Sequence, residues 1–219
     1  MGSDAVGLNY NIVRQLLDDF EAYFGDRLGS VKMLELGSQE FRPDTFPLRH
    51  QARRYRTPKA YFESLGIEHV SIDLNGLRGS LKCDLSLPLS DTGMASRFDV
   101  ATNFGTIEHI DTKGFHGQWQ AFKTMHDCVK PGGMMLHTLP QHGVIRGHCL
   151  FKYTAEFPGR LAEANGYEIR VNAVALKLML AVSYVKVSDT PFMAESDFGT
   201  KIGVIMSRRT RRVIAQQNN

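Results

Sequence analysis

The sequence predicts an α/β fold: a doubly wound, mainly parallel sheet with helices on both of its faces. Two observations lead to this fold class. Short apolar, strand-like segments alternate with amphipathic helical segments along most of the chain, and glycine or polar residues directly follow several of the strand-like segments. Strands separated by helices of this length need crossover connections, which make neighbouring strands parallel and the connections right-handed. Ligands of such sheets bind at the carboxyl ends of the strands.

The first elements are one helix and one buried strand. Residues 9–24 carry apolar side chains at helical spacing, and Gly25 can end that helix. Residues 31–37 form a short apolar run that ends in glycine, which is typical of a buried strand leading into a tight turn. Residues 38–60 carry three prolines and many arginines, so we expect a long loop there with one helix at most.

The remainder of the chain continues the alternation. A helix is expected at about 119–129, where apolar residues recur at helical spacing, and it stops at the Pro-Gly-Gly sequence of 131–133. Another helix is expected at 153–165, with Thr154 as its cap and Gly166 as its stop. The predicted strands are 69–74, 81–85, 98–103 and 134–139, followed by the β-branched segments 167–175, 182–188 and 200–206.

Composition limits the class of protein. With 219 residues, 42% hydrophobic and 22% charged, the chain resembles ordinary globular proteins, and we expect a single domain over 1–219. No apolar run approaches the roughly 20 residues of a membrane helix, and the N-terminus lacks a signal pattern, so we expect a cytoplasmic protein without a membrane partner. Its three cysteines (Cys83, Cys128 and Cys149) form no CxxC pair and are expected to be free thiols.

The informative residues stand at predicted strand ends. Gly37 follows the first strand, where a missing side chain lets backbone N–H groups approach a ligand. Asp73 ends the second strand, and a carboxylate there can accept hydrogen bonds from both hydroxyls of a ribose. Asp84 follows the third strand and could accept from an adenine amino group while Leu85 covers the ring. Asn103 ends the fourth strand.

In this order, the motifs resemble those of the class I S-adenosylmethionine-dependent methyltransferases over about residues 31–140. The matching segments are Leu-Glu-Leu-Gly at 34–37, Ile-Asp at 72–73, Cys-Asp-Leu-Ser-Leu-Pro at 83–88, Phe-Asp-Val at 98–100, Ile-Glu-His-Ile at 107–110 and Val-Lys-Pro-Gly-Gly at 129–133. The resemblance implies a seven-stranded sheet and S-adenosyl-L-methionine as the cofactor. It implies cofactor contacts from Glu35, Gly37 and Ser38 at the methionine end, Asp73 and Leu74 at the ribose, Asp84 and Leu85 at the adenine, and Asn103 and Phe104 beside the sulfonium.

The chain departs from the family's pattern after Gly37. The family's loop usually holds two or three glycines, whereas Ser38, Gln39 and Glu40 follow here, and 36 positions separate Gly37 from Asp73. An inserted loop at about 40–60 explains this spacing. The insert is rich in basic and aromatic residues: Arg42, Arg49, His50, Arg53, Arg54, Arg56 and Lys59, with Phe41, Phe46 and Tyr55. It could bind an anionic acceptor or an RNA backbone, but we favour a solvated lid with apolar anchors.

The acceptor side is less well marked. His109 follows the fourth strand beside Glu108, and an imidazole there could take the acceptor's proton. Alternatively, His109 only shapes the pocket, because positioning alone can supply up to about 7–11 kcal/mol of an in-line transfer. The residues predicted to border the acceptor are His142, His148, Tyr153 and Arg53. We expect no metal site, since His137, His142 and His148 lack the spacing of zinc ligands.

The sequence therefore predicts methyl transfer to an oxygen or nitrogen atom, with a small-molecule or saccharide-type acceptor reached by exclusion. Residues 103–106 lack the Asn-Pro-Pro-Tyr signature associated with nucleobase amino groups, and no cysteine stands there for attack on a pyrimidine. A formal charge of +3 allows a nucleic-acid partner without favouring it. The alternatives are an RNA methyltransferase that uses the insert, a non-catalytic subunit of the same fold, and an oxidoreductase, which lacks its GxGxxG turn here. The oligomeric state is left open.

Overall fold

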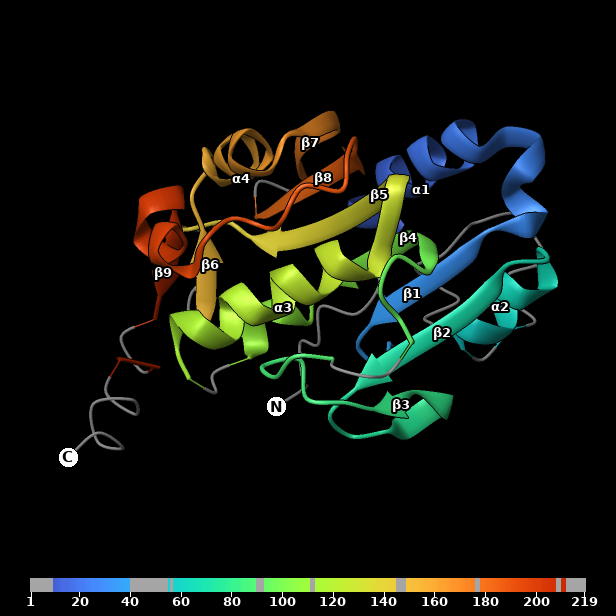
Figure 1. Ribbon diagram of the computed structural model, residues 1–219, viewed down its shortest axis with the longest axis horizontal. Helices are drawn as coiled ribbons and strands as arrows, with labels where there is room; N and C mark the ends of the chain where they lie inside the picture. Colours follow the sequence, from blue (N-terminus) through green and yellow to red (C-terminus); the bar gives the residue numbers. More distant parts are fainter. Residues whose placement is uncertain are drawn as a thin grey trace.

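The computed structural model describes residues 10–39, 55, 57–89, 93–110, 113–144, 149–175, 178–207 and 210–211. A seven-stranded sheet organises the chain in the order β3-β2-β1-β4-β5-β8-β7, which confirms the predicted mainly parallel α/β fold (Figure 1). Neighbouring strands from β3 to β5 are parallel, and β8 is antiparallel to both β5 and β7. The strands are β1 (Lys32–Leu36), β2 (Glu68–Asp73), β3 (Leu81–Lys82), β4 (Phe98–Phe104), β5 (Val129–Pro140), β7 (Tyr167–Ala175) and β8 (Met179–Lys186).

Helices cover both faces of the sheet. On one face α1 (Tyr10–Phe24) and α2 (Pro58–Ser64) pack on β1, β4 and β8 through one apolar cluster. On the other face α3 (Phe115–Cys128) and α4 (Phe157–Asn165) pack through a second cluster. In Figure 1, β3 lies at one edge of the sheet, β7 lies at the opposite edge, and α3 runs in front of the central strands. Among the described residues, no helix is long and apolar enough to cross a membrane.

Local sequence explains where the helices begin and end. The apolar side of α1 buries a set of side chains at helical spacing: Val13, Leu16, Leu17, Phe20 and Phe24. At α2, the Thr57 hydroxyl accepts a hydrogen bond from the Ala60 N–H at 3.2 Å, and Pro58 occupies the first turn, where its missing N–H costs nothing. Gly166 ends α4 in the left-handed conformation, with φ 65°, as its predicted stop requires.

Several predicted boundaries were wrong, including that of the strand expected at 200–206, where only Val204–Met206 forms a strand and Gly199–Ile202 is a 3₁₀ turn. The helix expected from 153 begins only at Phe157, because residues Phe151–Tyr153 form a strand, β6, that pairs with β9 (Val204–Met206). Thr154 does not cap the helix; its backbone N–H donates to the Gly203 carbonyl at 2.9 Å, which continues this small sheet. The third strand is only two residues long, and β5 starts five residues early, at Val129.

Short 3₁₀ turns connect several elements. The turn η4 (Ile107–His109) follows β4 at the carboxyl edge of the sheet, which is the edge where such sheets bind ligands. The others are η1 (Gly25–Ser30), η3 (Leu77–Gly79), η5 (Glu195–Asp197) and η6 (Gly199–Ile202).

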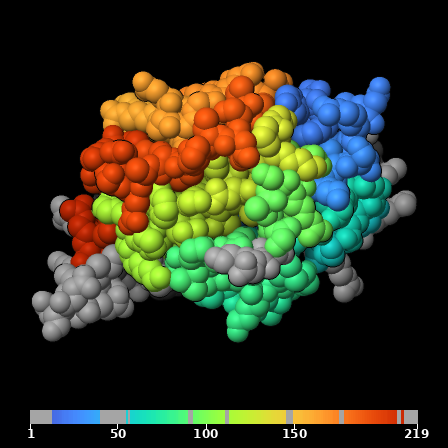
Figure 2. All heavy atoms as spheres, viewed as in Figure 1, coloured from blue at the N-terminus to red at the C-terminus, as the bar shows by residue number. Residues whose placement is uncertain are grey.

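The space-filling view shows the segments from β3 and α3 forming one continuous surface below the α4 and β7 region (Figure 2).

Candidate functional site

The turn after β1 requires glycine at position 37. Gly37 has φ 101°, and its N–H donates to the Ile72 carbonyl at 2.8 Å, so the turn is joined to β2. A Cβ atom at Gly37 would lie 2.1 Å from Thr106 Oγ1, in the loop after β4. That Oγ1 donates to the Leu36 carbonyl at 2.8 Å and accepts from Gln39 Nε2 at 2.9 Å. The tips of β1, β2 and β4 are therefore held together around a backbone with no side chain.

Asp73 ends β2 and organises the adjacent turns. Its Oδ2 accepts a hydrogen bond from the Ser38 N–H at 2.6 Å, and its Oδ1 accepts one from the Asn75 N–H at 3.0 Å. The side chain is half-buried, and a carboxylate offers about four acceptor positions, so two remain for a ligand. The Ser38 hydroxyl donates to the Leu77 carbonyl at 3.0 Å, which fixes the turn further.

The segment after β3 lies next to Asp73. The Cys83 N–H donates to the Asp73 carbonyl at 3.0 Å, which places Asp84 and Leu85 immediately beyond the tip of β2. Asp84 Oδ1 accepts hydrogen bonds from the N–H and the hydroxyl of Ser86 at 2.9 and 2.7 Å, and Leu85 is buried. Leu74 is 64% exposed, which leaves a large apolar side chain open beside the predicted ribose position.

Asn103 and Phe104 end β4, and both are buried. Asn103 Oδ1 accepts hydrogen bonds from the N–H groups of Thr106 and Ile107 at 3.2 and 3.0 Å, so its side chain shapes the turn into η4. Phe104 packs into the apolar cluster beneath α1. These contacts direct both side chains into the protein. A role at the cofactor would therefore fall to their backbone atoms.

Glu35 lies within β1, beside Ser71 of β2 and Thr102 of β4 in the sheet register. It is buried, and its Oε2 lies 3.6 Å from Nε2 of the buried His69. Burial, followed by the negative charge of Asp73, raises the pKa of Glu35 to about 8. Burial also lowers the pKa of His69 to about 4, with a further contribution from the charge of Lys59. Both groups are therefore neutral at pH 7.

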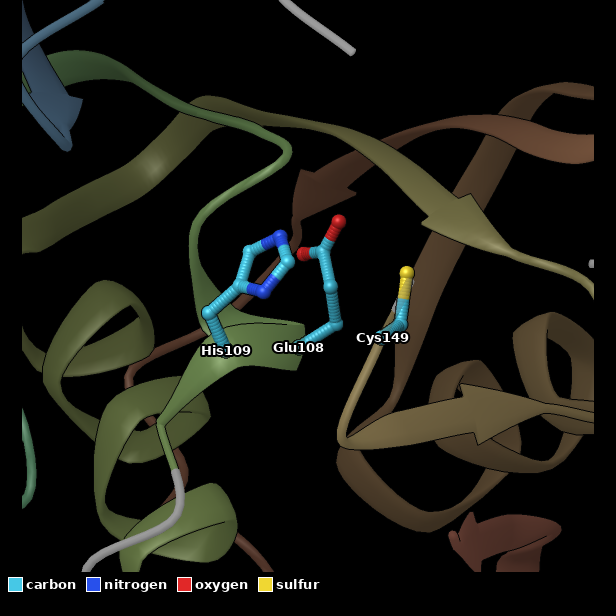
Figure 3. A group of neighbouring side chains, drawn as sticks. All are labelled: Glu108, His109 and Cys149. Carbon is cyan, nitrogen blue, oxygen red and sulfur yellow. The ribbon is translucent and has the colours of Figure 1, made fainter. Parts of the chain in front are cut away.

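The loop after β4 brings together a second group of polar side chains. Side-chain donor atoms of Glu108, His109 and Cys149 all lie within 4.8 Å of one another (Figure 3). Glu108 is 1% exposed, and burial raises its pKa to about 8. His109 is exposed, whereas Cys149 is buried, and burial together with Glu108 raises the pKa of that thiol to about 12. Cys149 was not among the residues that the sequence pointed to.

The residues predicted to border the acceptor lie in different environments. His142 is exposed, and its backbone N–H donates to the Tyr153 carbonyl at 2.8 Å, so the loop after β5 runs beside β6. The Tyr153 side chain is fully buried, and its hydroxyl donates to Gln118 Oε1 at 2.7 Å. Its side chain is therefore part of the core next to the site. Arg53 and His148 lie outside the described residues.

Two members of the predicted basic insert are described. Lys59 Nζ donates to the His69 carbonyl at 2.8 Å and pairs with Glu63 at 2.6 Å. The ring of Tyr55 packs edge-on against Tyr61, with ring centres 5.9 Å apart. Both side chains are thus used to attach this segment to α2 and β2. The other basic and aromatic residues named for the insert lie outside the described part of the chain.

A cavity of about 510 Å³ lies away from these strand tips, between α3 and the segment before β4. Its wall includes Met94, Trp119 and Lys123, and none of the described site residues predicted from the sequence contributes to it. No local sequence pattern indicated this cavity, because its walls combine side chains of α3 with side chains of the irregular segment before β4.

The sequence matches no family model, and comparison with curated proteins gives no match. Solved structures that share the fold include a protein from Thermobifida fusca assigned as a methyltransferase (14% identity, 80% of this chain and 80% of that chain, TM-score 0.51). TehB from Haemophilus influenzae is also similar (14% identity, 78% of this chain and 62% of that chain, TM-score 0.50). A third is a SAM-dependent methyltransferase from Aquifex aeolicus (15% identity, 84% of this chain and 94% of that chain, TM-score 0.49). The sheet order and the first two of these structures show that the chain has the class I Rossmann-like fold of SAM-dependent methyltransferases.

Proposed function

We propose that the protein is an S-adenosylmethionine-dependent methyltransferase that acts on an oxygen or nitrogen atom of a small acceptor. The observation that carries the proposal is the convergence of Gly37, Asp73 and Asp84 at one edge of the sheet. Backbone hydrogen bonds join the Gly37 turn to β2 and the Cys83 N–H to Asp73, so the three tips form one continuous wall. A nucleoside with a charged tail fits such a wall at the carboxyl ends of parallel strands.

Each part of the proposed cofactor has a residue suited to it. The Gly37 turn lies beside the tip of β2, and Thr106 approaches it closely because it has no side chain; this compact turn suits the methionine end, with Ser38 and Glu35 nearby. Asp73 keeps free acceptor positions for the ribose hydroxyls, and the exposed Leu74 offers it an apolar contact. Asp84 and Leu85 would hold the adenine. When bound, the cofactor supplies a methyl group on a positively charged sulfur.

The chain's own contribution to the reaction is positioning. The acceptor's lone pair must lie in line with the carbon–sulfur bond, and fixing that geometry can supply about 7–11 kcal/mol of the barrier. The acceptor atom bonds to the methyl carbon as the carbon–sulfur bond breaks, and the acceptor then loses its proton to solvent or to a base. The proposal requires no general base. We still expect the acceptor to be bordered by the loops after β4 and β5, which carry Glu108, His109 and His142.

Calorimetry tests the cofactor assignment directly. The purified protein should bind S-adenosylmethionine and S-adenosylhomocysteine and should not bind NAD. Asp73→Ala should weaken S-adenosylhomocysteine binding by about 1–3 kcal/mol, or roughly 5- to 150-fold, because a charged hydrogen-bond partner is lost. Asp99→Ala is the matched control, since Asp99 accepts from the Lys32 N–H and pairs with Lys130 near the amino end of β4, away from the proposed site.

The outcomes separate the alternatives. Preference for NAD would point to an oxidoreductase, and binding of none of the three ligands would point to a non-catalytic subunit. Equal affinity of the wild type and Asp73→Ala would reject the proposed ribose contact. An RNA acceptor would require binding by the basic insert, whose two described members, Tyr55 and Lys59, are engaged in packing and an ion pair.

A further inference from the structure

We propose that Glu108, His109 and Cys149 form a binding site for one divalent transition-metal ion, and that zinc fits its donor set best. The three residues come from two segments, since Glu108 and His109 belong to η4 and Cys149 precedes β6. Their donor atoms lie within 4.8 Å of one another, and Figure 3 shows the Glu108 side chain between those of His109 and Cys149. Metal binding here would be independent of methyl transfer.

The buried carboxyl of Glu108 is an independent sign of a ligand. Its side chain is 1% exposed, and Oε2 has no hydrogen-bond partner among the described residues. A buried polar atom without a partner costs about 1–3 kcal/mol, so such atoms usually have a partner that completes them. A metal ion bound between Glu108, His109 and Cys149 would supply that partner.

The two segments that carry the donors are held in place by one glutamine. Gln118 Nε2 donates to the Ile107 carbonyl at 2.6 Å and to the Ile110 carbonyl at 3.0 Å, on either side of Glu108 and His109. Gln118 Oε1 accepts from the Tyr153 hydroxyl in β6, shortly after Cys149. The amide of this fully buried side chain thus fixes both segments, and with them the relative positions of the three donors.

The kinds of donor select the ion. Magnesium and calcium bind almost only oxygen, so a thiol and an imidazole argue against both ions. Zinc accepts sulfur, nitrogen and carboxylate oxygen together, and three protein ligands leave its fourth position open for water or a substrate atom. A small molecule with an oxygen, nitrogen or sulfur donor would be the matching ligand. A coordinated His109 could not also take a proton through the same nitrogen, so this site excludes the base role at that atom.

Cobalt(II) is a suitable probe because it replaces zinc and its thiolate complexes absorb strongly. After treatment with a chelator, the wild-type protein should bind one equivalent of cobalt, with a thiolate-to-cobalt charge-transfer band and the visible bands of a tetrahedral ion. One equivalent of zinc should remove both sets of bands. Cys149→Ser should lack the charge-transfer band, and Glu108→Gln and His109→Asn should each bind cobalt at least tenfold more weakly.

Matched controls keep the test specific. Cys128→Ser removes another buried thiol, and His142→Asn removes another exposed imidazole, and both should bind cobalt like the wild type. Circular dichroism of the metal-free proteins checks that each variant folds. If Cys149→Ser does not fold, the exposed His109→Asn substitution decides the question together with its His142→Asn control. The proposal is overturned if wild-type protein shows no thiolate band or if His109→Asn binds cobalt with unchanged affinity.

Discussion

The two ends of the site differ in how their polar groups are satisfied. At the tips of β1 and β2, the polar atoms are half-exposed and joined by short hydrogen bonds between neighbouring turns, as in the Ser38 N–H to Asp73 contact of 2.6 Å. Beyond β4, Glu108 is buried with a pKa raised to about 8 and one oxygen without a partner among the described residues. In the first region the hydrogen bonds described above pair polar atoms of neighbouring turns. In the second region Glu108 has a buried oxygen that still lacks a partner among the described residues. The proposed cofactor wall thus consists of backbone and local contacts, whereas the properties of the polar groups beyond β4 depend on burial.

Gly37→Ala should give the largest effect, because it damages the first region at its centre. A side chain at φ 101° is strained, and its Cβ would lie 2.1 Å from Thr106 Oγ1. Together these should lower the free energy of unfolding by about 3–4 kcal/mol and abolish S-adenosylhomocysteine binding. Denaturant unfolding and calorimetry measure the two effects. Gly132→Ala is the control, since Gly132 has φ 78° with open space around it and should lose only about 1–2 kcal/mol.

Glu35→Gln tests whether burial also raises the pKa of a carboxyl group in the first region. The folded-state pKa of about 8 lies above the unfolded value near 4.5, so the native state holds the extra proton between these pH values. The wild type should therefore lose stability as pH rises from 5 to 8, by up to about 1.4 kcal/mol per pH unit. Glu35→Gln should lack the Glu35 contribution to this loss, and its stability relative to the wild type should increase by about 3–4 kcal/mol over that range. Parallel pH profiles from urea unfolding would contradict a buried, protonated Glu35.

Tyr153→Phe separates a core residue from an acceptor-binding one. The substitution removes the hydroxyl that donates to Gln118 Oε1, so the free energy of unfolding should fall by about 1–2 kcal/mol. S-adenosylhomocysteine affinity should remain that of the wild type. A loss of acceptor binding without any loss of stability would instead indicate that Tyr153 contacts the acceptor. Tyr23→Phe is a comparison variant, because the Tyr23 hydroxyl donates to the Gly132 carbonyl at an exposed position.

Leu74→Ala should give the smallest effect. The side chain is 64% exposed, so the free energy of unfolding should change by no more than about 0.5 kcal/mol. If the cofactor packs on it, S-adenosylhomocysteine affinity should fall by about 1 kcal/mol, or roughly fivefold. Val174→Ala, at a 52% exposed position on β7 at the opposite edge of the sheet, should change neither quantity. Unchanged affinity in Leu74→Ala would remove this residue from the proposed site.

The sequence predicts the region at the tips of β1 and β2 better than the region beyond β4. The strands β1, β2 and β4 and the residues at their tips could be located from the sequence, because each depends on apolar runs and a residue next to the strand end. The approach of Cys149 to Glu108, and the pairing of β6 with β9 around Tyr153, depend on contacts between segments about 40 and 50 positions apart, which no local pattern records. Burial of Glu35 and Glu108 likewise arises only when the helices cover the sheet.

The reversed direction of β8 has a consequence for where ligand-contacting residues can come from. In the parallel strands, residues near the ligand edge follow the strand, but in β8 they precede it, and the Leu178 carbonyl before β8 accepts from the Gln141 N–H at 2.9 Å. The loop that carries His142 is therefore attached to the turn before β8. This turn precedes its strand, so a search for residues that follow strands would miss it. Substitutions just upstream of β8 should thus affect the proposed acceptor side without altering any residue that is proposed to hold the nucleoside.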